Sequence, residues 1–581
     1  MTRREALAAG LLLGLGAGGW DAVAILAGNP RSFTGAADAA RFAAGSVALY
    51  AAAGLPAGAL LVAIPRRPIA WVSVGLAAWL FVWAGVRVHV RWFFGEPLTD
   101  PRYAGVNLAL LAACAGAAWL FHRALGRRLR PALAPARLAV AALVAGAITA
   151  GLMRGGGSTA SGGDAGPPPP GARDVLLVTW DTTRADHLSV YGYPRGTTPA
   201  LDRLAREAAL WTDLWAPIPL TNPSHASLFT GLTPREHKVR NNGTPLPADV
   251  ATVVPALSDA GWRCGAFVSG IPLKAGLSGL APGFSTYDDA FSPLERVHPM
   301  LTTLAGVRVA DRVLPVDFIE RRADRTADAA IAWLERTHGP RFLWVHFFDP
   351  HTPYAAAPPL RSRFARPSVW TAHGVPAHEW PVADYDAELR ATDRATRRLL
   401  DAFERTSGGA GVVVMTADHG EGLGQHGELA HGTLLFAEDL RVPGIVAGVD
   451  TLAGIRTGLA TTVRIGALAR DAAGLERDPE DEAPADAPLA TDVVRLETFA
   501  PEGRQDRSAV IDRAGRKAEV VWATGEERAF DLRADPGESR PRPVDEIAPD
   551  LRQFLTAPGR AASEALDPEV VRRLRALGYL H

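Results

Sequence analysis

Cysteine is nearly absent from this chain of 581 residues, which contains two, Cys114 and Cys264. Cys114 falls in an apolar stretch and Cys264 in the polar part of the chain, so we expect no disulfide bond between them. Two cysteines are too few for a disulfide framework or for a cysteine-ligated metal site, and both are excluded. The chemistry of this protein must therefore rest on other side chains.

An excess of charge of one sign is also lacking. The chain has 61 basic and 62 acidic residues and a formal net charge of −1. Proteins that bind nucleic acid or another polyanion usually carry a surplus of basic residues, so the sequence predicts no such partner. Nearly all the basic residues are arginine, and we derive no function from this bias.

Charged residues are sparse in the first 153 residues. Five apolar runs in this part come close to the roughly 20 residues that a helix needs to cross a bilayer: Ala6–Ala27, Phe42–Ile64, Ile69–Val86, Tyr103–Phe121 and Leu138–Met153. A cleaved signal peptide accounts only for the first run. Arginines gather on one side of the runs, and the positive-inside rule then places the N-terminus in the cytoplasm. The sequence thus predicts a multi-pass protein of the plasma (inner) membrane with an extracytoplasmic catalytic domain.

The composition changes after the five-span membrane domain predicted for residues 1–153. Residues 154–173 are rich in Gly, Ser and Pro, which cannot form a packed element, and are expected to be a linker. Residues 174–475 have the composition of a soluble α/β domain. An acidic, proline-rich stretch then precedes a smaller C-terminal subdomain, residues 491–581, which we expect to complete the catalytic unit.

Acidic and histidine side chains follow three apolar runs of the α/β part. The run "DVLLVTW" is followed by Asp181, "RFLWVHFF" by Asp349 and His351, and "GVVVMTA" by Asp418 and His419. Apolar runs that alternate with helical patterns predict a mostly parallel sheet with helices on both faces. In such sheets ligands bind beyond the carboxyl ends of the strands. One Asp after a strand is usually a helix cap, whereas three such strand ends indicate a common site.

The stretch "PLTNPSHASLFTG" predicts the start of a helix. Pro223 suits the first turn of a helix, and Thr221 or Asn222 suits the cap. The N-terminus of such a helix offers N–H groups to an anionic group. Two interpretations stay open from these residues alone, because Thr221 is either an ordinary cap or a residue that takes part in chemistry.

These motifs together resemble the sulfatase family of the alkaline phosphatase superfamily. The resemblance covers "DTTRADHLSVYGYPRGTTPALDRLA", "TNPSHASLFTGLTPREHKVRNNG", "VHFFDPHTPY", "TADHGEGLGQHGELAHG" and "LRVPGIVAG", which follow in the family's order, and "AFDLRADPGE" and "RRLRALGYL" near the end of the chain. It implies an alkaline-phosphatase-like α/β/α sandwich with a smaller C-terminal subdomain.

The resemblance also implies roles for individual residues. Asp181, Asp418 and His419 correspond to metal ligands, and Thr221 to a residue that is both ligand and nucleophile. The remaining candidates are expected to contact the substrate: His351 and His431, which are also candidate proton donors or ligands of a second metal ion, and His225 and Asn242.

Three positions depart from the pattern of true sulfatases. That pattern has Cys or Ser at the nucleophile, converted to formylglycine, with Arg four residues later, where this chain has Thr221 and His225. Threonine is not a substrate for that conversion. A second Asp that follows the first is replaced by Thr182. A Thr nucleophile, an Asp-His pair and five spans are similar to phosphoethanolamine transferases and lipoteichoic acid synthases.

A divalent cation is the expected cofactor. Coordination to a cation lowers the pKa of a threonine hydroxyl and makes the alkoxide available. A ligand set of two carboxylates and one imidazole favours zinc or manganese, with calcium, which prefers oxygen ligands throughout, as a further option.

We therefore expect a membrane-anchored, metal-dependent hydrolase or transferase that acts on phosphate (di)esters or sulfate esters. The expected substrate is a membrane lipid or an envelope glycan. Two alternatives stay open. One is a sulfatase proper in which Thr221 acts unmodified, and the other is a catalytically inactive module that keeps the fold for binding.

Overall fold

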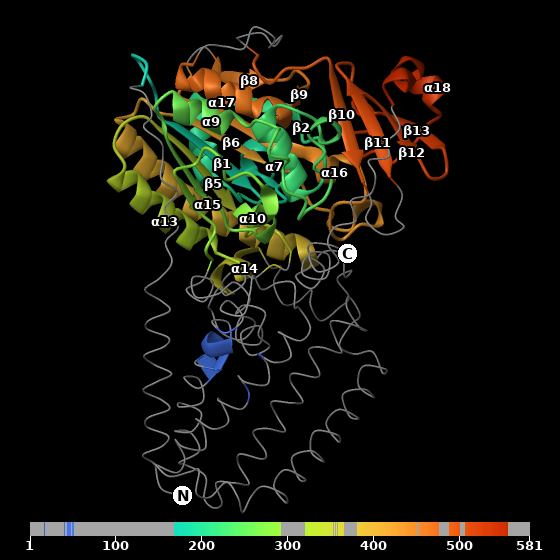
Figure 1. Cartoon of the computed structure of the whole chain (residues 1–581). Helices are drawn as coiled ribbons and strands as arrows, with labels where there is room; N and C mark the ends of the chain where they lie inside the picture. The colour runs from blue at the N-terminus through green and yellow to red at the C-terminus, as the bar shows by residue number, and fades with distance from the viewer. Residues whose placement is uncertain are drawn as a thin grey trace, which may run out of the picture. The chain divides into compact units, whose positions relative to one another are not determined.

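The structure of the protein is a computed structural model. It describes residues 168–291, 320–352, 354, 356, 358–364, 380–449, 452–475, 487–499 and 506–555, and a few residues before position 51. The chain divides into two units, and every candidate site residue belongs to the unit made of residues 159–289 and 320–581 (Figure 1). We describe this unit, which we call the catalytic unit.

No helix among the described residues is both long enough and apolar enough to cross a membrane. The longest described helix, α15 (Trp380–Ser407), has 28 residues but carries acidic and basic side chains along its length. This finding contradicts the five predicted transmembrane helices and the multi-pass inner-membrane location that depended on them. The prediction rested on runs of Ala- and Gly-rich sequence without charge. The absence of charge does not by itself show that a run forms a membrane-spanning helix. The five runs themselves lie, apart from isolated positions, outside the described residues.

A nine-stranded mixed sheet forms the centre of the catalytic unit. The order along the sheet is β4-β3-β5-β1-β6-β7-β2-β8, and β9 pairs with β2. The five strands from β4 to β6 are parallel to one another, whereas β7 is antiparallel to both β6 and β2. The bounds are β1 (Val175–Trp180), β2 (Ala209–Trp215), β3 (Arg263–Phe267), β4 (Thr286–Asp288), β5 (Arg341–Phe347), β6 (Val412–Ala417), β7 (Arg441–Ala447), β8 (Gly454–Arg456) and β9 (Ala460–Thr461).

Helices cover both faces of this sheet, as the alternation of apolar runs and helical patterns predicted (Figure 1). One face packs on α13 (Ala323–Arg336) and α15, and the other on α7 (Thr221–Thr230), α9 (Val253–Asp259) and α17 (Ile465–Ala473). The shorter described helices are α6 (Pro199–Leu204), α8 (Pro234–His237), α10 (Ala275–Ser278), α14 (Pro358–Phe364), α16 (Ala437–Leu440) and α18 (Val544–Ile547).

Strand β1 is buried along its whole length, because both faces of the sheet are covered. Leu176, Val178 and Trp180 point to the face of α13 and α15, where they join the main apolar core. Successive side chains of a strand point to opposite faces, so Thr179 lies on the face of α7. This alternation places the hydroxyl of Thr179 in the protein interior, where it contacts His225 of α7.

A second, antiparallel sheet lies towards the C-terminus. It consists of β10 (Val493–Thr498), β11 (Arg507–Asp512), β12 (Arg516–Val521) and β13 (Glu526–Asp531) in sequence order. Lys517 of β12 is fully buried, and its ammonium donates to Glu538 and to the carbonyl of Leu435. Leu435 lies four residues after His431, so the hydrogen bond of Lys517 links this sheet to a segment of the candidate site. The predicted boundaries of the domains stay predictions.

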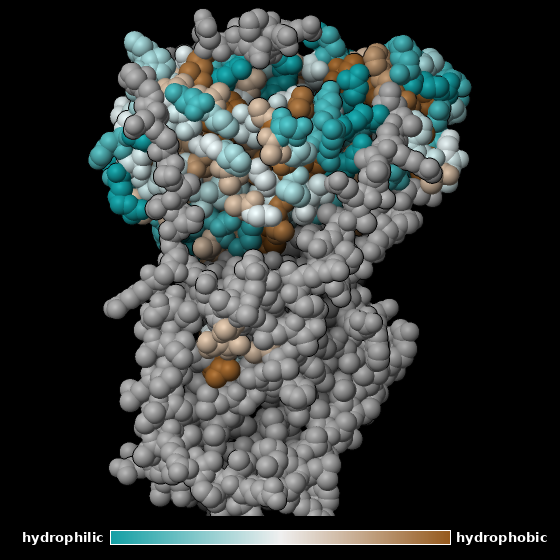
Figure 2. Space-filling model, in the orientation of Figure 1, coloured by the Kyte–Doolittle hydropathy of each residue, from teal (hydrophilic) through white to brown (hydrophobic). Residues whose placement is uncertain are grey.

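Figure 2 shows hydrophilic and intermediate residues over most of the described surface on that side, with scattered hydrophobic ones. Among the described residues, the large hydrophobic side chains that are clearly exposed are Leu429 and Ile455, which are far apart in the sequence.

Candidate active site

Two aspartates meet at the carboxyl ends of adjacent parallel strands. Trp180 of β1 pairs in register with Ala417 of β6, so Asp181 and Asp418 leave the sheet side by side. Asp418 Oδ1 accepts the backbone N–H groups of Thr182, at 3.2 Å, and of His419, at 2.8 Å. These bonds fix one oxygen of Asp418 and leave Oδ2 directed towards the other candidate ligands.

Four side chains surround one point at this edge of the sheet. His419 Nε2 lies 3.8 Å from Asp181 Oδ1, 3.6 Å from Asp418 Oδ2 and 3.5 Å from Thr221 Oγ1. Ligand atoms around a tetrahedral cation with bonds of about 2.1 Å are about 3.4 Å apart. All four side chains are fully buried. The spacing therefore fits a small divalent cation. The sequence predicted such a cation from the types of these residues.

The polar atoms that face this point lack other partners. Both carboxylate oxygens of Asp181 and Oδ2 of Asp418 are buried with no hydrogen-bond partner among the described residues. Burial raises the pKa of Asp181 well above its ordinary value, and Glu421 raises it further. Burial and the charge of Asp181 do the same to the pKa of Asp418. Ionising two buried carboxylates of this kind is energetically unfavourable unless a cation is bound between them.

His419 is prepared to act as a neutral ligand. Burial lowers its pKa well below the ordinary value, and the neighbouring His431 lowers it further. The Nδ1–H group donates to the carbonyl of Gly420 at 2.9 Å, so the lone pair is on Nε2, the nitrogen that faces the two aspartates. The residues present thus fit a divalent cation in charge, protonation and spacing.

Thr221 does not cap its helix. It is the first residue of α7, and the cap position is Leu220, whose side chain accepts no hydrogen bond. The N–H of Asn222 donates to Asn242 Oδ1 at 2.9 Å, and that of Ser224 to the carbonyl of Leu220 at 3.0 Å. The Thr221 hydroxyl is left facing His419. With these two N–H groups engaged and none on the proline between them, the helix end offers an anion fewer donors than we predicted.

His225 and Asn242 contact the first turn of α7. The Nδ1–H of His225 donates to the carbonyl of Thr221 at 2.8 Å, and Nε2 lies 3.0 Å from Thr179 Oγ1. That hydroxyl also accepts from Trp344 Nε1 at 3.0 Å. His225 is fully buried, and Asn242 is almost so. Contact of either residue with a substrate stays a prediction.

His351 and His431 lie next to the candidate metal ligands. The ring centre of His431 is 4.4 Å from that of His419 and 5.0 Å from that of His351. Burial lowers the pKa of His431 to about 4. His351 stacks on Phe348, with 4.4 Å between ring centres. The structure thus brings together, from segments far apart in the sequence, the residues that we predicted for the metal, the nucleophile and the proton donors.

The model of the sulfatase family matches residues 173–474, which is more than half of the chain. The chain belongs to the sulfatase family. It is 23% identical over 300 residues to the Δ4,5-hexuronate-2-O-sulfatase of Bacteroides thetaiotaomicron, an alignment that covers 47% of this chain and 62% of the relative. It is 27% identical over 234 residues to the dog (Canis lupus familiaris) N-acetylgalactosamine-6-sulfatase, covering 35% of this chain and 44% of the relative. Each alignment thus spans less than two thirds of the relative.

Solved structures confirm the fold. A 2-O GAG sulfatase superposes with a TM-score of 0.51 at 19% identity, covering 66% of this chain and 89% of the other. The phosphonate monoester hydrolase of Agrobacterium radiobacter superposes with a TM-score of 0.50 at 20% identity, covering 66% and 93%. These comparisons show that the chain has the sulfatase fold. They do not confirm the predicted likeness to phosphoethanolamine transferases and lipoteichoic acid synthases.

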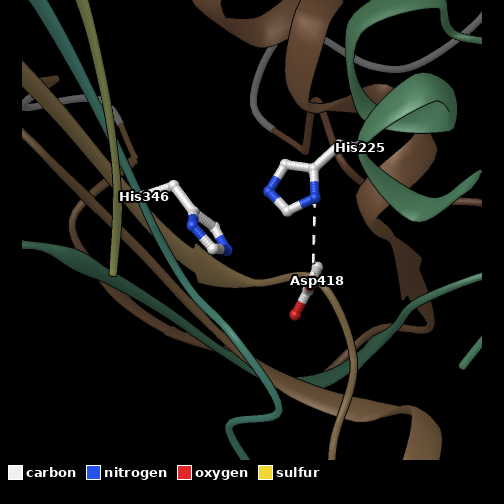
Figure 3. A group of neighbouring side chains, drawn as sticks. All are labelled: His225, His346 and Asp418. Atoms are coloured by element: carbon white, nitrogen blue, oxygen red, sulfur yellow. Dashed lines mark ion pairs between the residues drawn. The ribbon is translucent and has the colours of Figure 1, made fainter. Parts of the chain in front are cut away.

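Two residues of this sulfatase-family site were missed from the sequence. His346 lies inside β5, and its Nε2 is 3.3 Å from Asp181 Oδ2. In Figure 3 the rings of His346 and His225 both approach Asp418, and the dashed line marks the 3.7 Å pair of His225 and Asp418. Glu421 is also buried, beside His431. A histidine within the apolar run "RFLWVHFF" was the one available signal for His346, and Glu421 gave none.

Thr182, which replaces the second Asp of true sulfatases, has an unusual backbone. Its φ is +47°, in the left-handed region that β-branched residues rarely adopt. The conformation is held by two bonds, since its N–H donates to Asp418 and its carbonyl accepts from Tyr385 at 2.7 Å. Strained backbone of this kind concentrates at functional sites. At Thr182 it aims the N–H at Asp418, a candidate metal ligand.

Proposed function

We propose that this chain is a cation-dependent hydrolase of sulfate esters carried by sugars, with the unmodified Thr221 as its nucleophile. The observation that carries the proposal is the position of the Thr221 hydroxyl, which caps nothing and lies 3.5 Å from His419 Nε2 within the ligand set. The hexuronate and N-acetylgalactosamine sulfatases among the relatives support a sugar sulfate. Of the predicted substrates, we therefore favour a glycan.

Asp181, Asp418 and His419 would hold the cation together with Thr221. When bound, a divalent cation supplies the positive charge that stabilises the alkoxide of a coordinated hydroxyl and the developing charge on the ester. We propose zinc or manganese, because the donors mix carboxylate oxygen with imidazole nitrogen. The backbone N–H of Thr182 holds the carboxylate of Asp418 in place, and His346 Nε2 lies 3.3 Å from Asp181 Oδ2.

The first half of the reaction forms a covalent intermediate. The Thr221 hydroxyl loses its proton to solvent, its oxygen attacks the sulfur atom to form a new S–O bond, and the S–O bond to the sugar breaks. His351 or His431 gives a proton to the leaving sugar oxygen. Burial keeps the His431 imidazole neutral in the free site, and an incoming anionic ester favours the protonated form that this step requires.

The second half regenerates the hydroxyl. A water molecule attacks the sulfur atom of the sulfo-threonine, the bond to the Thr221 oxygen breaks, and this oxygen takes up a proton from solvent. The histidine that gave its proton is now neutral and accepts one from the water. Inorganic sulfate is released, and Thr221 is restored without any modification of the side chain.

Phosphodiesters are the second candidate substrates. Thr221 and Thr182 favour them, because each replaces a residue of the true sulfatase pattern, and an unmodified hydroxyl can form a phospho-threonine by the same in-line attack. The same residues would act in the same roles. The catalytically inactive module is a third candidate, and a stoichiometric, tightly held metal ion would exclude a protein that has lost its site.

The test is a substrate panel with the full chain, loaded with zinc or with manganese. We expect release of sulfate from sugar sulfates, and less or no release of alcohol from phosphodiesters. Thr221→Ala should abolish turnover, and Thr221→Ser should keep part of it. Because the Thr221 hydroxyl does not cap its helix, the melting temperature of Thr221→Ala should barely change.

The covalent adduct provides an independent readout. After an acid quench with a slow substrate, the peptide that contains "TNPSHASLFTG" should carry the sulfo or phospho group on Thr221. Wild-type turnover by Thr221→Ala would refute the nucleophile. Turnover of phosphodiesters but not of sulfate esters would select the second candidate function.

A further inference from the structure

Glu421 joins the two segments that carry the substrate-facing histidines. It lies two residues after His419 and is fully buried. Its Oε1 accepts from Nδ1 of His431 at 2.9 Å, and its Oε2 faces the backbone N–H of Thr352 at 3.4 Å. One carboxylate thus contacts both the loop after β5 and the loop that follows β6.

The contact with His431 decides which nitrogen of that ring faces the site. An ionised carboxylate can only accept hydrogen bonds, so the proton of the neutral ring is on Nδ1 and the lone pair is on Nε2. The ring is held in the row formed by His419, His431 and His351. Without the carboxylate, the ring could rotate or adopt the other tautomer.

His351 is held through one peptide group. Its Nδ1–H donates to the carbonyl of Thr352, the residue whose N–H faces Glu421. The proton of this ring is therefore also on Nδ1, and its Nε2 is available for a reacting atom. A shift of the Glu421 carboxylate would move both histidines at once.

The backbone of Glu421 makes its own hydrogen bonds, independent of the side chain. Its N–H donates to the carbonyl of Glu438 at 3.1 Å, and its carbonyl accepts from Nη1 of Arg184 at 3.2 Å. The carboxylate lies in a buried region that already holds Asp181 and Asp418, where a third negative charge is unfavourable. A glutamate at this position therefore needs a favourable interaction that offsets the repulsion.

We propose that Glu421 is a positioning residue that fixes the tautomer and orientation of His431 and, through Thr352, of His351. The proposal rests on the proposed function, because it assigns those two histidines to proton transfer. Outer residues of this kind typically contribute 10- to 100-fold to activity.

Glu421→Gln is the informative variant. A glutamine has the same size, but only one of its two terminal atoms accepts hydrogen bonds. It can satisfy His431 or Thr352 and must present an N–H group to the other. The control is Glu497→Gln, a buried glutamate on β10 that pairs with Arg235 and contacts neither histidine.

The measurement is a double-variant cycle on the metal-loaded full chain. We expect Glu421→Gln to lower kcat by about 10- to 100-fold on esters with poor leaving groups, and to change it little on nitrophenyl esters, which need no proton. Added to a variant that already lacks both histidines, His351→Ala with His431→Ala, Glu421→Gln should cause no further loss. Metal content should equal that of the wild type, and Glu497→Gln should keep wild-type turnover.

Additive losses, or an equal loss for every leaving group, would refute the proposal. If the wild type turned over no ester of the panel, the proposed function would fail. The same variants would then be compared by their affinity for inorganic sulfate, measured by calorimetry. Glu421→Gln should then weaken that binding, with no further loss in the combined variant. Unchanged sulfate affinity in Glu421→Gln would overturn the role of Glu421 by itself.

Discussion

At the scale of single residues, the two oxygens of Asp418 have different surroundings. Oδ1 accepts two backbone N–H groups, whereas Oδ2 faces the candidate cation position. An amide at this position can meet both N–H groups only by placing its oxygen at the Oδ1 position. Its NH2 group then points at the cation, which it cannot ligate.

We therefore predict that Asp418→Asn loses the metal ion and turnover together while the fold is kept. The loss of one ligand charge adds to the loss of the ligand atom. Metal content after dialysis, measured beside the melting temperature of the metal-free protein, tests this. A variant that keeps a full complement of metal would show that Asp418 is not a ligand.

The residues of the site differ in how far the sequence could predict them. Asp181, Asp418 and His419 follow apolar runs directly, and the carboxyl ends of parallel strands meet at one edge of a sheet. His346 could not be found in this way, because a buried histidine inside a strand has the same pattern as a core residue. Glu421 acts through contacts with His431 and Thr352, which depend on how two loops fold against each other.

At the scale of elements, Asp393 of α15 holds the first turn of α6. Its carboxylate accepts the N–H groups of Ala200, at 3.0 Å, and Leu201, at 3.2 Å. Burial raises its pKa to about 7, although these N–H groups oppose the shift. The folded chain therefore binds this proton more tightly than the unfolded chain, in which the pKa is about 3.8.

This shift predicts a pH dependence at the contact between α6 and α15. A raised pKa in the folded state stabilises the fold at low pH, and that contribution is lost as the pH rises towards and through 7. Asp393→Asn cannot ionise. The difference in melting temperature between this variant and the wild type should shift in favour of the variant from pH 5 to pH 8. A constant difference over that range would contradict the shift.

The start of α7 shows the limit of predictions at this scale. The sequence predicted a helix there and left Thr221 as cap or nucleophile. In the structure the cap position belongs to Leu220, one residue earlier. A boundary that differs by one residue changes a hydroxyl from a cap into a group that faces the ligands, and local sequence does not determine boundaries to that accuracy.

At the scale of the whole molecule, a buried ion pair of the C-terminal part contacts the segment between β6 and β7. Lys517 of β12 donates to Glu538, and Glu538 also accepts the N–H of Ala437 at 2.7 Å. The ammonium lies 5.4 Å from the ring centre of Phe436. Both charged side chains are fully buried.

We predict that Lys517→Met lowers the free energy of unfolding by about 3–5 kcal/mol, because it leaves a buried carboxylate without its partner. The combination of Lys517→Met with Glu538→Gln should cost less, since a glutamine is neutral and can still accept from Ala437. Chemical denaturation of the metal-free proteins tests both. Equal stability of the single and the combined variant would show that the charge of Glu538 is paired elsewhere.

The α/β character of the chain could be predicted because strand and helix patterns alternate locally along the sequence. The membrane prediction had a weaker basis. It depended on runs without charge, whereas the described residues contain no helix suited to a bilayer. The second sheet could be predicted only as a smaller subdomain. The pairing of its strands depends on contacts between segments, which the local pattern of one segment does not indicate.

The two aspartates of the site lie more than 200 residues apart in the sequence and meet only through the pairing of β1 with β6. A chain that has not formed this pairing has no site for the cation. Binding to the folded state alone would add about 2.7 kcal/mol to stability at a free metal concentration 100 times the dissociation constant. The metal content of a preparation is then a count of its correctly folded molecules, obtained without any substrate.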